Sequence, residues 1–382
     1  MMMMLTLLAI AIVIYHHAVY PALLKLGSRL AERSEPVVLP EIWPRITIIV
    51  PAHNEARWIA DKIVNLACLD YPEDQLDIVI ACDGCTDETA RIARETIASL
   101  GLEGQIRVCD YKTNRGKLAL LNAEIALART EIVALSDVSA LISIDALKLT
   151  ARHFADPGVG VVAASYMLAK AGTAGEHAYW RFQSRLREEE ARIAGAIGAS
   201  GGFFAIRRGL FSPLPADTIN DDFVLPMQIV EKGYSATLDP DIHAVELEPS
   251  SLVADWRRRQ RIGAGNFQQS LRLWRLLSPK RPSLAFVFLS GKWLRPLQPF
   301  AMLAALIGSS ILASESLIFF LAFAGQATAY SLALLVQIRP RASWLGLSRK
   351  FHYFVVGHAA ALVGICRYLI GQDRLRPGNS RA

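Results

Sequence analysis

Short apolar runs alternate with helix-like segments between Pro44 and about Gln269, and this alternation constrains the fold more than any other feature. Four runs are apolar and mostly rich in β-branched residues, which predicts buried strands; they lie at 46–50, 77–81, 105–109 and 131–135. Helical segments separate them, at 60–68, 88–100 and 117–128. Such alternation predicts an α/β fold with a mostly parallel sheet, whose ligands bind beyond the carboxyl ends of the strands.

An uncharged apolar run precedes this region. It extends from Leu5 to Leu24, which is about the length that spans a bilayer. A signal peptide is the competing interpretation, but no basic segment precedes the run and no A-x-A-like cleavage site follows it. Lys25, Arg29 and Arg33 come directly afterwards, so the positive-inside bias predicts that the next domain lies in the cytoplasm.

Further apolar segments follow Pro279. The segment 284–294 contains a lysine and suggests an interfacial helix, whereas 297–313 and 317–338 have the composition of two membrane spans. The segment 351–370 is interrupted by histidines and an arginine, so it is either a third span or a re-entrant or interfacial helix. Arginines after the second span and in the tail favour a cytoplasmic position for both.

The composition agrees with a membrane protein. The chain of 382 residues is 52% apolar with a net charge of +6, and its basic residues cluster beside apolar runs, which favours a membrane surface over nucleic acid as the partner. Five cysteines, an odd number, suggest reduced thiols rather than a disulfide framework. We therefore expect an anchor at 1–27, a cytoplasmic α/β domain at 40–275, and interfacial and membrane segments at 280–382. The expected location is the inner (cytoplasmic) membrane, as a multi-pass protein.

Polar residues follow the first two predicted strands. The stretch PAHNE at 51–55 could present backbone amides and a carboxylate to a nucleotide, or could be an ordinary polar loop. Asp83 could accept hydrogen bonds from a base or a ribose. Cys82 and Cys85 flank it as C-x-x-C, which would fit a redox or zinc site, but zinc requires a second ligand pair and none has matching spacing. Packing is the better account of these thiols.

Charged residues stand at three further positions. Arg115-Gly116-Lys117 opens a helix and could hold a diphosphate, or could be an exposed helix start. Asp137 follows the fourth strand and could bind Mg²⁺ or Mn²⁺, which take oxygen ligands, or could cap a helix. Asp221-Asp222 could supply a general base, because neighbouring carboxylates raise one pKa, or could be a helix N-cap.

A basic cluster stands just before the C-terminal apolar segments. Four arginines lie within 257–261. Their forked donors could clamp a pyrophosphate. They could instead form a juxtamembrane patch that contacts anionic lipid.

In this order, the clusters resemble the membrane-bound branch of the family 2 inverting glycosyltransferases, which have a GT-A fold. The stretch 51–56 is similar to the family's P-x-x-N-E start, 115–122 to its G-K-x-x-x-L-N segment, and Asp137 to the first carboxylate of its D-x-D metal motif. The stretch 201–204 looks like the acceptor-side loop. Asp221-Asp222 stands where the family has an E-D pair whose second member is the general base.

The resemblance implies transfer of a sugar, with inversion, from a nucleotide-sugar donor to a lipid-linked or glycan acceptor, with UDP as the expected nucleotide and Mg²⁺ or Mn²⁺ as the cofactor. It implies that Asp222, beside Asp221, is the general base and that Asp137 holds the metal. The implied donor-binding residues are Pro51, Ala52, Asn54, Glu55, Asp83, Lys117, Asp137, Arg258 and Arg261. The implied acceptor-binding residues are Gly201, Gly202 and Phe203.

The chain departs from the family pattern at two motifs. Ser139 occupies the third position of D-x-D, so metal binding would depend on Asp137, the donor phosphates and water. In the Q-x-x-R-W motif, Arg258 replaces Gln and Ile262 replaces Trp, and only Arg261 is kept. Because that motif holds the donor and the growing acceptor in processive synthases, its erosion favours single-sugar transfer. The alternatives are a processive polysaccharide synthase, a sugar nucleotidyltransferase and a non-catalytic membrane subunit.

Overall fold

A computed structural model describes residues 1–31, 40, 42–169, 174–248, 252–338 and 346–372. The described residues form two compact units. The sheet unit comprises Ala31–Lys170 and Arg187–Pro249, and the helical unit comprises Met1–Leu30, Ala171–Leu186 and Ser250–Arg374. The predicted domain boundaries divide the chain differently, because residues 250–275 belong to the helical unit; those boundaries remain a prediction.

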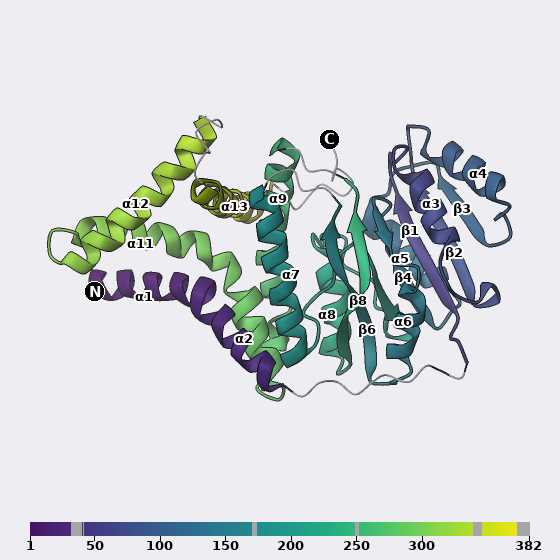
Figure 1. Ribbon diagram of the computed structural model, residues 1–382, viewed down its shortest axis with the longest axis horizontal. Helices are drawn as coiled ribbons and strands as arrows, with labels where there is room; N and C mark the ends of the chain where they lie inside the picture. The colour runs from purple at the N-terminus through teal and green to yellow at the C-terminus, as the bar shows by residue number, and fades with distance from the viewer. Residues whose placement is uncertain (32–39, 41, 170–173, 249–251, 339–345, 373–382) are drawn as a thin grey trace. The chain divides into compact units, whose positions relative to one another are not determined.

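The sheet unit is built on one eight-stranded sheet with the order β3-β2-β1-β4-β7-β6-β8-β5 (Figure 1). The strands are β1 Ile46–Ala52, β2 Leu76–Asp83, β3 Ile106–Tyr111, β4 Ile132–Leu135, β5 Ala140–Ile142, β6 Val159–Leu168, β7 Phe204–Arg207 and β8 Ser235–Glu246. Strands β3, β2, β1 and β4 run parallel, as do β6 and β8, whereas β7 is antiparallel to both of its neighbours and β5 to β8. The predicted mostly parallel α/β sheet is confirmed.

Helices cover both faces of this sheet. The helices of the sheet unit are α3 Ile59–Ala67, α4 Thr89–Leu100, α5 Lys117–Leu127, α6 Ala146–Phe154 and α8 Asp221–Glu231, with the last turns of α7 Ala174–Ala194. Apolar side chains of α3, α4 and α6 share one core with alternate residues of β1 and β2. Leu120 of α5 packs against Val79 and Ala81 of β2 in a separate cluster, on the opposite face of that strand. All seven strands and helices expected between 46 and 135 are present, with bounds within two residues of the prediction at every end.

The parallel strands set the position of the polar clusters. In the register of β1 and β2, Ala52 lies opposite Cys82. Asp83 pairs with Tyr111 of β3, and β4 ends at Leu135, two residues before Asp137. Because these parallel strands end at one edge of the sheet, the chain segments that follow them gather there.

The helical unit contains α1 Met2–Ile14, a π-helical turn Tyr15–Val19 and α2 Tyr20–Leu30, which form one continuous helical stretch. Its other helices are the first part of α7, α9 Leu252–Arg272, α10 Pro282–Phe288, α11 Gln298–Leu312, α12 Leu317–Ile338 and α13 Gly346–Leu369. Among the described residues, Met2–Leu30 and Leu317–Ile338 are long and apolar enough to cross a membrane, by length and composition. Both are mostly unburied within the protein, as a membrane-facing helix is.

The other expected membrane segments also fall on helices. The segment 297–313 corresponds to α11, which has 15 residues and is therefore short for a span. The segment 284–294 corresponds to α10 and a π-helical turn, Leu289–Trp293. The segment 351–370 lies mostly within α13, and whether it crosses the bilayer remains a prediction. Arg339, Arg341, Arg374, Arg376 and Arg381, which supported the cytoplasmic assignment, lie outside the described residues.

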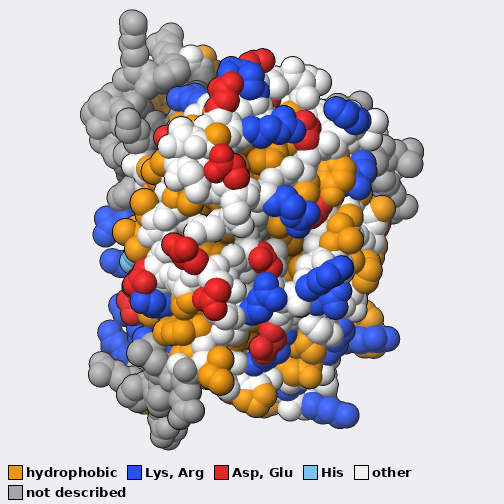
Figure 2. All heavy atoms as spheres, turned by 90° about the vertical axis from the view of Figure 1, so that its right-hand side faces the viewer, with side chains coloured by type: hydrophobic (Ala, Val, Ile, Leu, Met, Phe, Trp, Pro, Cys, Tyr) orange, Lys and Arg blue, Asp and Glu red, His pale blue; other side chains and the backbone are white. Residues whose placement is uncertain are grey.

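One face of the molecule mixes both signs of charge. Figure 2 shows basic, acidic and hydrophobic side chains interspersed on it. Ion pairs on the surface of the sheet unit show the same mixing, for example Arg94 with Asp110 at 2.7 Å and Arg91 with Glu95 at 2.6 Å. Exposed pairs of this kind add only about 0–1 kcal/mol each to the stability of the fold. These charges therefore form an ordinary solvated surface.

Candidate active site

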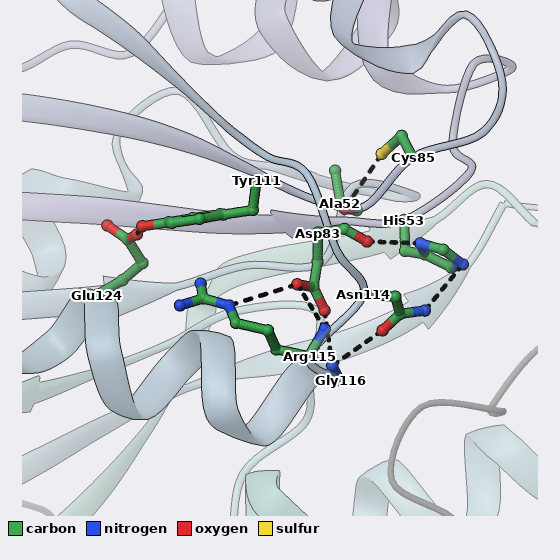
Figure 3. Close-up of polar contacts among 9 residues, drawn as sticks. All are labelled: Ala52, His53, Asp83, Cys85, Tyr111, Asn114, Arg115, Gly116 and Glu124. Atoms are coloured by element: carbon green, nitrogen blue, oxygen red, sulfur yellow. Dashed lines mark hydrogen bonds and ion pairs between the residues drawn. The ribbon is translucent and has the colours of Figure 1, made fainter.

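Asp83 joins the end of β2 to the loop that begins α5 (Figure 3). Its side chain is buried, with 2% of the residue exposed. The carboxylate accepts the backbone N–H of Arg115 at 3.0 Å and of Gly116 at 2.8 Å, and the Arg115 guanidinium lies 3.8 Å away. The loop can approach this closely because Gly84 has φ +60° and a Cβ there would overlap the backbone of Asn114. Asp83 therefore fixes the position from which α5 starts.

The PAHNE loop is locked to the loop that follows β2. Asn54 has φ +56°, a left-handed conformation that Asn tolerates. Its side-chain oxygen accepts the N–H of Thr86 at 2.8 Å. The N–H of Glu55 donates to Thr89 Oγ1 at 2.7 Å, and His53 Nδ1 lies 2.8 Å from the carbonyl oxygen of Asp83. The predicted donor residues at 51–55 thus lie beside Asp83, and Asn54 has a structural function that the sequence did not indicate.

The thiols of Cys82 and Cys85 form a hydrogen bond with each other. Cys82 is fully buried in the core, and Cys85 Sγ lies 3.6 Å from the carbonyl oxygen of Ala52. The hydrogen bond from Cys82 lowers the pKa of Cys85 to about 6, and the same contact, with burial, raises the pKa of Cys82. In the described part of the chain, no group of three or more His, Cys, Asp or Glu side chains could hold a metal ion by itself. Packing accounts for Cys82, whereas the lowered pKa of Cys85 predicts a more reactive thiol.

Lys117 brings two of the predicted acidic clusters together. It is the first residue of α5, and its Nζ lies 2.9 Å from Asp137 Oδ1 and 3.3 Å from Asp221 Oδ2. Burial opposes the charge of Lys117, but attraction to Asp137 and Asp221, with a smaller contribution from Asp222, raises its pKa above the ordinary range. Asp222 is the second residue of α8 and is partly exposed. Residues predicted from four separate motifs therefore meet at one edge of the sheet, with Asp83 holding the loop that carries Lys117.

The backbone of 201–202 lies against the metal motif. The N–H of Asp137 donates to the carbonyl oxygen of Gly201 at 2.9 Å, and Ser136 Oγ donates to that of Gly202 at 2.6 Å. A Cβ at Gly201 would overlap the carboxylate of Asp137, so only glycine leaves this carboxylate where it lies. Phe203 is fully buried in the core. Its side chain therefore supports the loop from inside, and acceptor binding by Gly201, Gly202 and Phe203 remains a prediction.

The two arginines predicted to bind the donor belong to the helical unit. Arg258 and Arg261 lie on α9. Arg258 Nη2 pairs with Asp255 Oδ1 at 3.0 Å, and its guanidinium lies 5.9 Å from the ring centre of Trp180. These contacts are within the helical unit, and a function of either arginine in donor binding remains a prediction.

Two ionisable residues near Asp137 were missed. Lys62 of α3 is fully buried and donates to Ser136 Oγ at 2.6 Å and to the carbonyl oxygen of Ala140 at 2.5 Å. Burial lowers its pKa to about 7, against the attraction of Asp137 and Glu246. Lys62 could have been found, because it stands on the apolar stripe that α3 presents to the core. Glu246 is the last residue of β8, and no sequence pattern near it indicated that it lies close to Asp137.

The residues at this edge fit a divalent cation. Asp137 offers a hard carboxylate oxygen of the type that Mg²⁺ and Mn²⁺ prefer, and 30% of its side chain is exposed. A cationic group, the Lys117 ammonium, already contacts it. Gly201 leaves room for this carboxylate, because a Cβ there would overlap it. A cation held here would take its remaining ligands from donor phosphates and water, because these metals usually bridge substrate phosphates.

A mostly parallel α/β sheet whose carboxyl edge gathers Asp137, Lys117 and the acidic pair Asp221-Asp222 is the arrangement expected of a GT-A fold. Residues 47–214 match the family model described as Glycosyl transferase family 2. The chain therefore contains a family 2 glycosyltransferase domain with a GT-A fold.

Several known proteins are similar to the chain. It is 25% identical over 269 residues to a beta-monoglucosyldiacylglycerol synthase of Synechocystis sp., which is 66% of this chain and 55% of that protein. A protein of the same name from Nostoc sp. is 28% identical over 247 residues, 62% of this chain and 52% of that protein. The chain thus spans about half the length of these relatives. Among solved structures, a mannosyltransferase of Pyrobaculum calidifontis in complex with GDP-Man and Mn²⁺ is 26% identical with a TM-score of 0.73, covering 96% of this chain and 99% of that one.

Two observations together associate this chain with a membrane. They are its apolar helices and its similarity to proteins whose names contain a membrane lipid. Met2–Leu30 and Leu317–Ile338 supply helices of sufficient length and apolarity. The names of these two relatives contain diacylglycerol, which is a membrane lipid.

Proposed function

We propose that this chain transfers one sugar, with inversion, from a nucleotide-sugar to a lipid acceptor at the cytoplasmic face of a membrane. The observation that carries the proposal is the contact of Lys117 with both Asp137 and Asp221. Through this contact, Lys117 connects Asp137, which we expect to face the donor phosphates, with Asp221. Asp221 belongs to the acidic pair that we expect to activate the acceptor. A donor and an acceptor that react must meet between such groups.

The acceptor is argued from the membrane segments and the relatives. An enzyme carried on helices such as Met2–Leu30 works within reach of membrane lipids. The relatives' names contain monoglucosyldiacylglycerol, so a lipid with a free hydroxyl, of the diacylglycerol type, is the acceptor class that we favour. Lys25 and Arg29, at the end of the first helical stretch, support a cytoplasmic position for the sheet unit under the positive-inside rule. The multi-pass arrangement is part of the same proposal.

In the proposed mechanism, Asp222 accepts the proton of the acceptor hydroxyl as the oxygen attacks the anomeric carbon and the nucleoside diphosphate departs. Inversion of an α-linked donor gives a β-glycoside, which is the linkage in the relatives' names. Asp221 and Asp137 hold the Lys117 ammonium at the edge where the diphosphate would lie. Mg²⁺ or Mn²⁺ held by Asp137 would neutralise negative charge on the diphosphate. Preorganised cationic groups of this kind stabilise a leaving anion without further reorganisation.

The donor is held, in this proposal, by the loops joined through Asp83. The buried carboxylate fixes the backbone at 115–116, and the locked 51–55 loop forms the other wall. UDP is the nucleotide expected from the resemblance, whereas the solved neighbour contains GDP-Man. A donor screen therefore has to include both uracil and guanine nucleotides.

The test uses the full-length protein in detergent micelles or nanodiscs. It is incubated with radiolabelled UDP-glucose, UDP-N-acetylglucosamine and GDP-mannose, with a membrane lipid extract and with or without Mn²⁺ or Mg²⁺. We expect one donor to yield a nucleoside diphosphate and a lipid that carries a single sugar. A long polymer would identify a processive synthase. Release of pyrophosphate would identify a nucleotidyltransferase, and no turnover with any donor would contradict an enzymatic function.

A pair of variants tests the proposed base. General-base catalysis contributes about 10²–10⁴-fold, so Asp222→Asn should lower kcat by this factor with little change in nucleoside diphosphate affinity. Asp61→Asn is the matched control, because Asp61 is an exposed carboxylate in the first turn of α3. Parent activity in Asp222→Asn would remove this residue from the mechanism.

A further inference from the structure

The third position of the metal motif lacks a carboxylate, and the structure shows what lies next to it. Ser139 stands at that position, with only 1% of the residue exposed. A neutral hydroxyl is a weaker ligand for a divalent cation than a carboxylate. The question is which oxygen ligand accompanies Asp137 at this edge of the sheet.

Strand pairing places a carboxylate beside Ser139. Ala140, the next residue, lies opposite Glu246 in the antiparallel pairing of β5 with β8. The N–H of Leu247 donates to the carbonyl oxygen of Ser139 at 2.8 Å. The side chains of Ser139 and Glu246 are themselves hydrogen-bonded. Since Ser139 is the hydroxyl donor, the carboxylate of Glu246 lies within hydrogen-bonding distance of the residue at the motif's third position.

The charges around Glu246 match those around Asp137. Lys62 donates to Ser136 Oγ and to the carbonyl oxygen of Ala140, the residue paired with Glu246, so this buried side chain lies next to the segments that carry the carboxylates of Asp137 and Glu246. Both attract the buried ammonium of Lys62. Glu246 is nevertheless partly exposed, like Asp137. Two partly exposed carboxylates at one edge of a sheet can both offer oxygen ligands to a divalent cation.

We propose that Glu246 supplies the carboxylate that Ser139 does not, and that it binds the divalent cation together with Asp137 when the nucleoside diphosphate is present. The inference rests on the proposed function, because the diphosphate provides the remaining ligands. Two protein carboxylates plus phosphate and water oxygens form a ligand set that suits Mg²⁺ or Mn²⁺. In this proposal, the second acid of the metal motif is on β8, the strand that pairs with β5, and not in the connection between β4 and β5.

The experiment measures Mn²⁺ binding directly, with full-length protein and saturating UDP or GDP, by electron paramagnetic resonance of free Mn²⁺. Glu246→Gln should weaken Mn²⁺ binding at least tenfold. Ser139→Asp, which restores the family motif, should recover most of the affinity in the double variant Ser139→Asp/Glu246→Gln. The matched control is Glu103→Gln, an exposed carboxylate before β3, at the opposite edge of the sheet from β5. It should leave the affinity unchanged.

The double variant separates a ligand from a merely structural residue. If Glu246 only stabilised the pairing of β5 with β8, an acid at position 139 would not restore Mn²⁺ binding. Parent Mn²⁺ affinity in Glu246→Gln, or no recovery in the double variant, would overturn the inference. Failure of the proposed function is a different result: the parent protein would release no nucleoside diphosphate from any donor. Sugar transfer by the parent with unchanged Mn²⁺ binding in Glu246→Gln would refute this inference alone.

Discussion

Lys117 Nζ lies 2.9 Å from Asp137 Oδ1, so the first residue of α5 forms an ion pair with the carboxylate that follows β4. The pair is not sealed off, because 38% of the Lys117 side chain and 30% of the Asp137 side chain are exposed. An incoming diphosphate can therefore compete for the ammonium, and an incoming cation can compete for the carboxylate. The contact positions both partners and is expected to rearrange when substrate binds.

Lys117→Met should change the two binding reactions in opposite directions. Loss of the ammonium removes one charge-assisted hydrogen bond to a diphosphate, so UDP or GDP should bind about tenfold more weakly without metal, about 1.4 kcal/mol. Mn²⁺ alone should bind more tightly, because Asp137 and Asp221 lose their neutralising partner. Isothermal titration calorimetry of each ligand measures both effects. Lys112→Met, at an exposed lysine five residues earlier, should change neither affinity; equal effects of the two variants would contradict a specific function of Lys117.

Gly201→Ala should weaken the metal site without unfolding the sheet. The new Cβ would overlap the carboxylate of Asp137, a side-chain end that can rotate away, so the protein should fold but lose the carboxylate position. We expect about a tenfold loss of Mn²⁺ affinity with UDP or GDP present, the lower end of the range for disturbed ligand geometry. Gly209→Ala is the control, because a Cβ at Gly209 meets no atom within 4 Å. Unchanged Mn²⁺ binding in Gly201→Ala would show that Asp137 does not hold the cation in its present position.

The sequence was sufficient to predict the parts of the site that follow parallel strands. Asp83 and Asp137 come directly after apolar runs, and the carboxyl ends of parallel strands must share an edge. Glu246 could not be predicted, because it reaches the site through pairing of β8 with β5, across more than a hundred residues of chain. Pairing between distant antiparallel strands leaves no periodic signal near either residue. The burial of Phe203 was equally hidden, because a motif match does not reveal that its side chain is buried in the core; its predicted part in acceptor binding remains a prediction.

Asp83→Asn should loosen the start of α5. The amide presents a donor toward the N–H groups of Arg115 and Gly116, so one of these buried hydrogen bonds is lost at a cost of about 1–3 kcal/mol. Amide hydrogen exchange at 115–116 should accelerate, and UDP or GDP binding should weaken with it. Asp110→Asn is the control, since Asp110 pairs with Arg94 at the surface and exposed pairs contribute about 1 kcal/mol or less. Parent exchange rates at 115–116 would show that the carboxylate does not hold this loop.

Cys85 should be the faster of two half-buried thiols to react with iodoacetamide at pH 7. The hydrogen bond from Cys82 lowers its pKa, whereas burial raises the pKa of Cys109, and the thiolate is the reactive form. Peptide mass spectrometry of timed alkylation gives both rates in one sample. The Cys85 rate should be nearly flat from pH 7 to 8, while the Cys109 rate should still rise. Cys82→Ala removes the hydrogen bond and should restore the steep rise at Cys85; a steep rise in the parent protein would contradict the assignment.

Lys62→Met should remove a pH dependence of stability. Burial lowers the pKa of Lys62 from 10.5 to about 7 in the folded protein, against the attraction of Asp137 and Glu246. Between these two values the unfolded chain binds more protons than the folded one, so this residue makes the unfolding free energy rise with pH. The slope is at most about 1.4 kcal/mol per pH unit, and no such slope arises below the folded pKa.

The measurement is the difference in Tm between the parent protein and Lys62→Met at several pH values from 7 to 9.5, in detergent micelles with a chelator to exclude metal binding. The parent should gain stability relative to the variant as the pH rises, because its buried amine no longer has to hold a proton. Lys148→Met is the matched control: Lys148 pairs with Asp70 at 2.6 Å on the surface, where 35% of its side chain is exposed. Its Tm difference from the parent should stay constant across this range. A constant difference for Lys62→Met as well would mean that the amine keeps its proton beneath Ser136 and acts as a fixed positive charge under the metal motif.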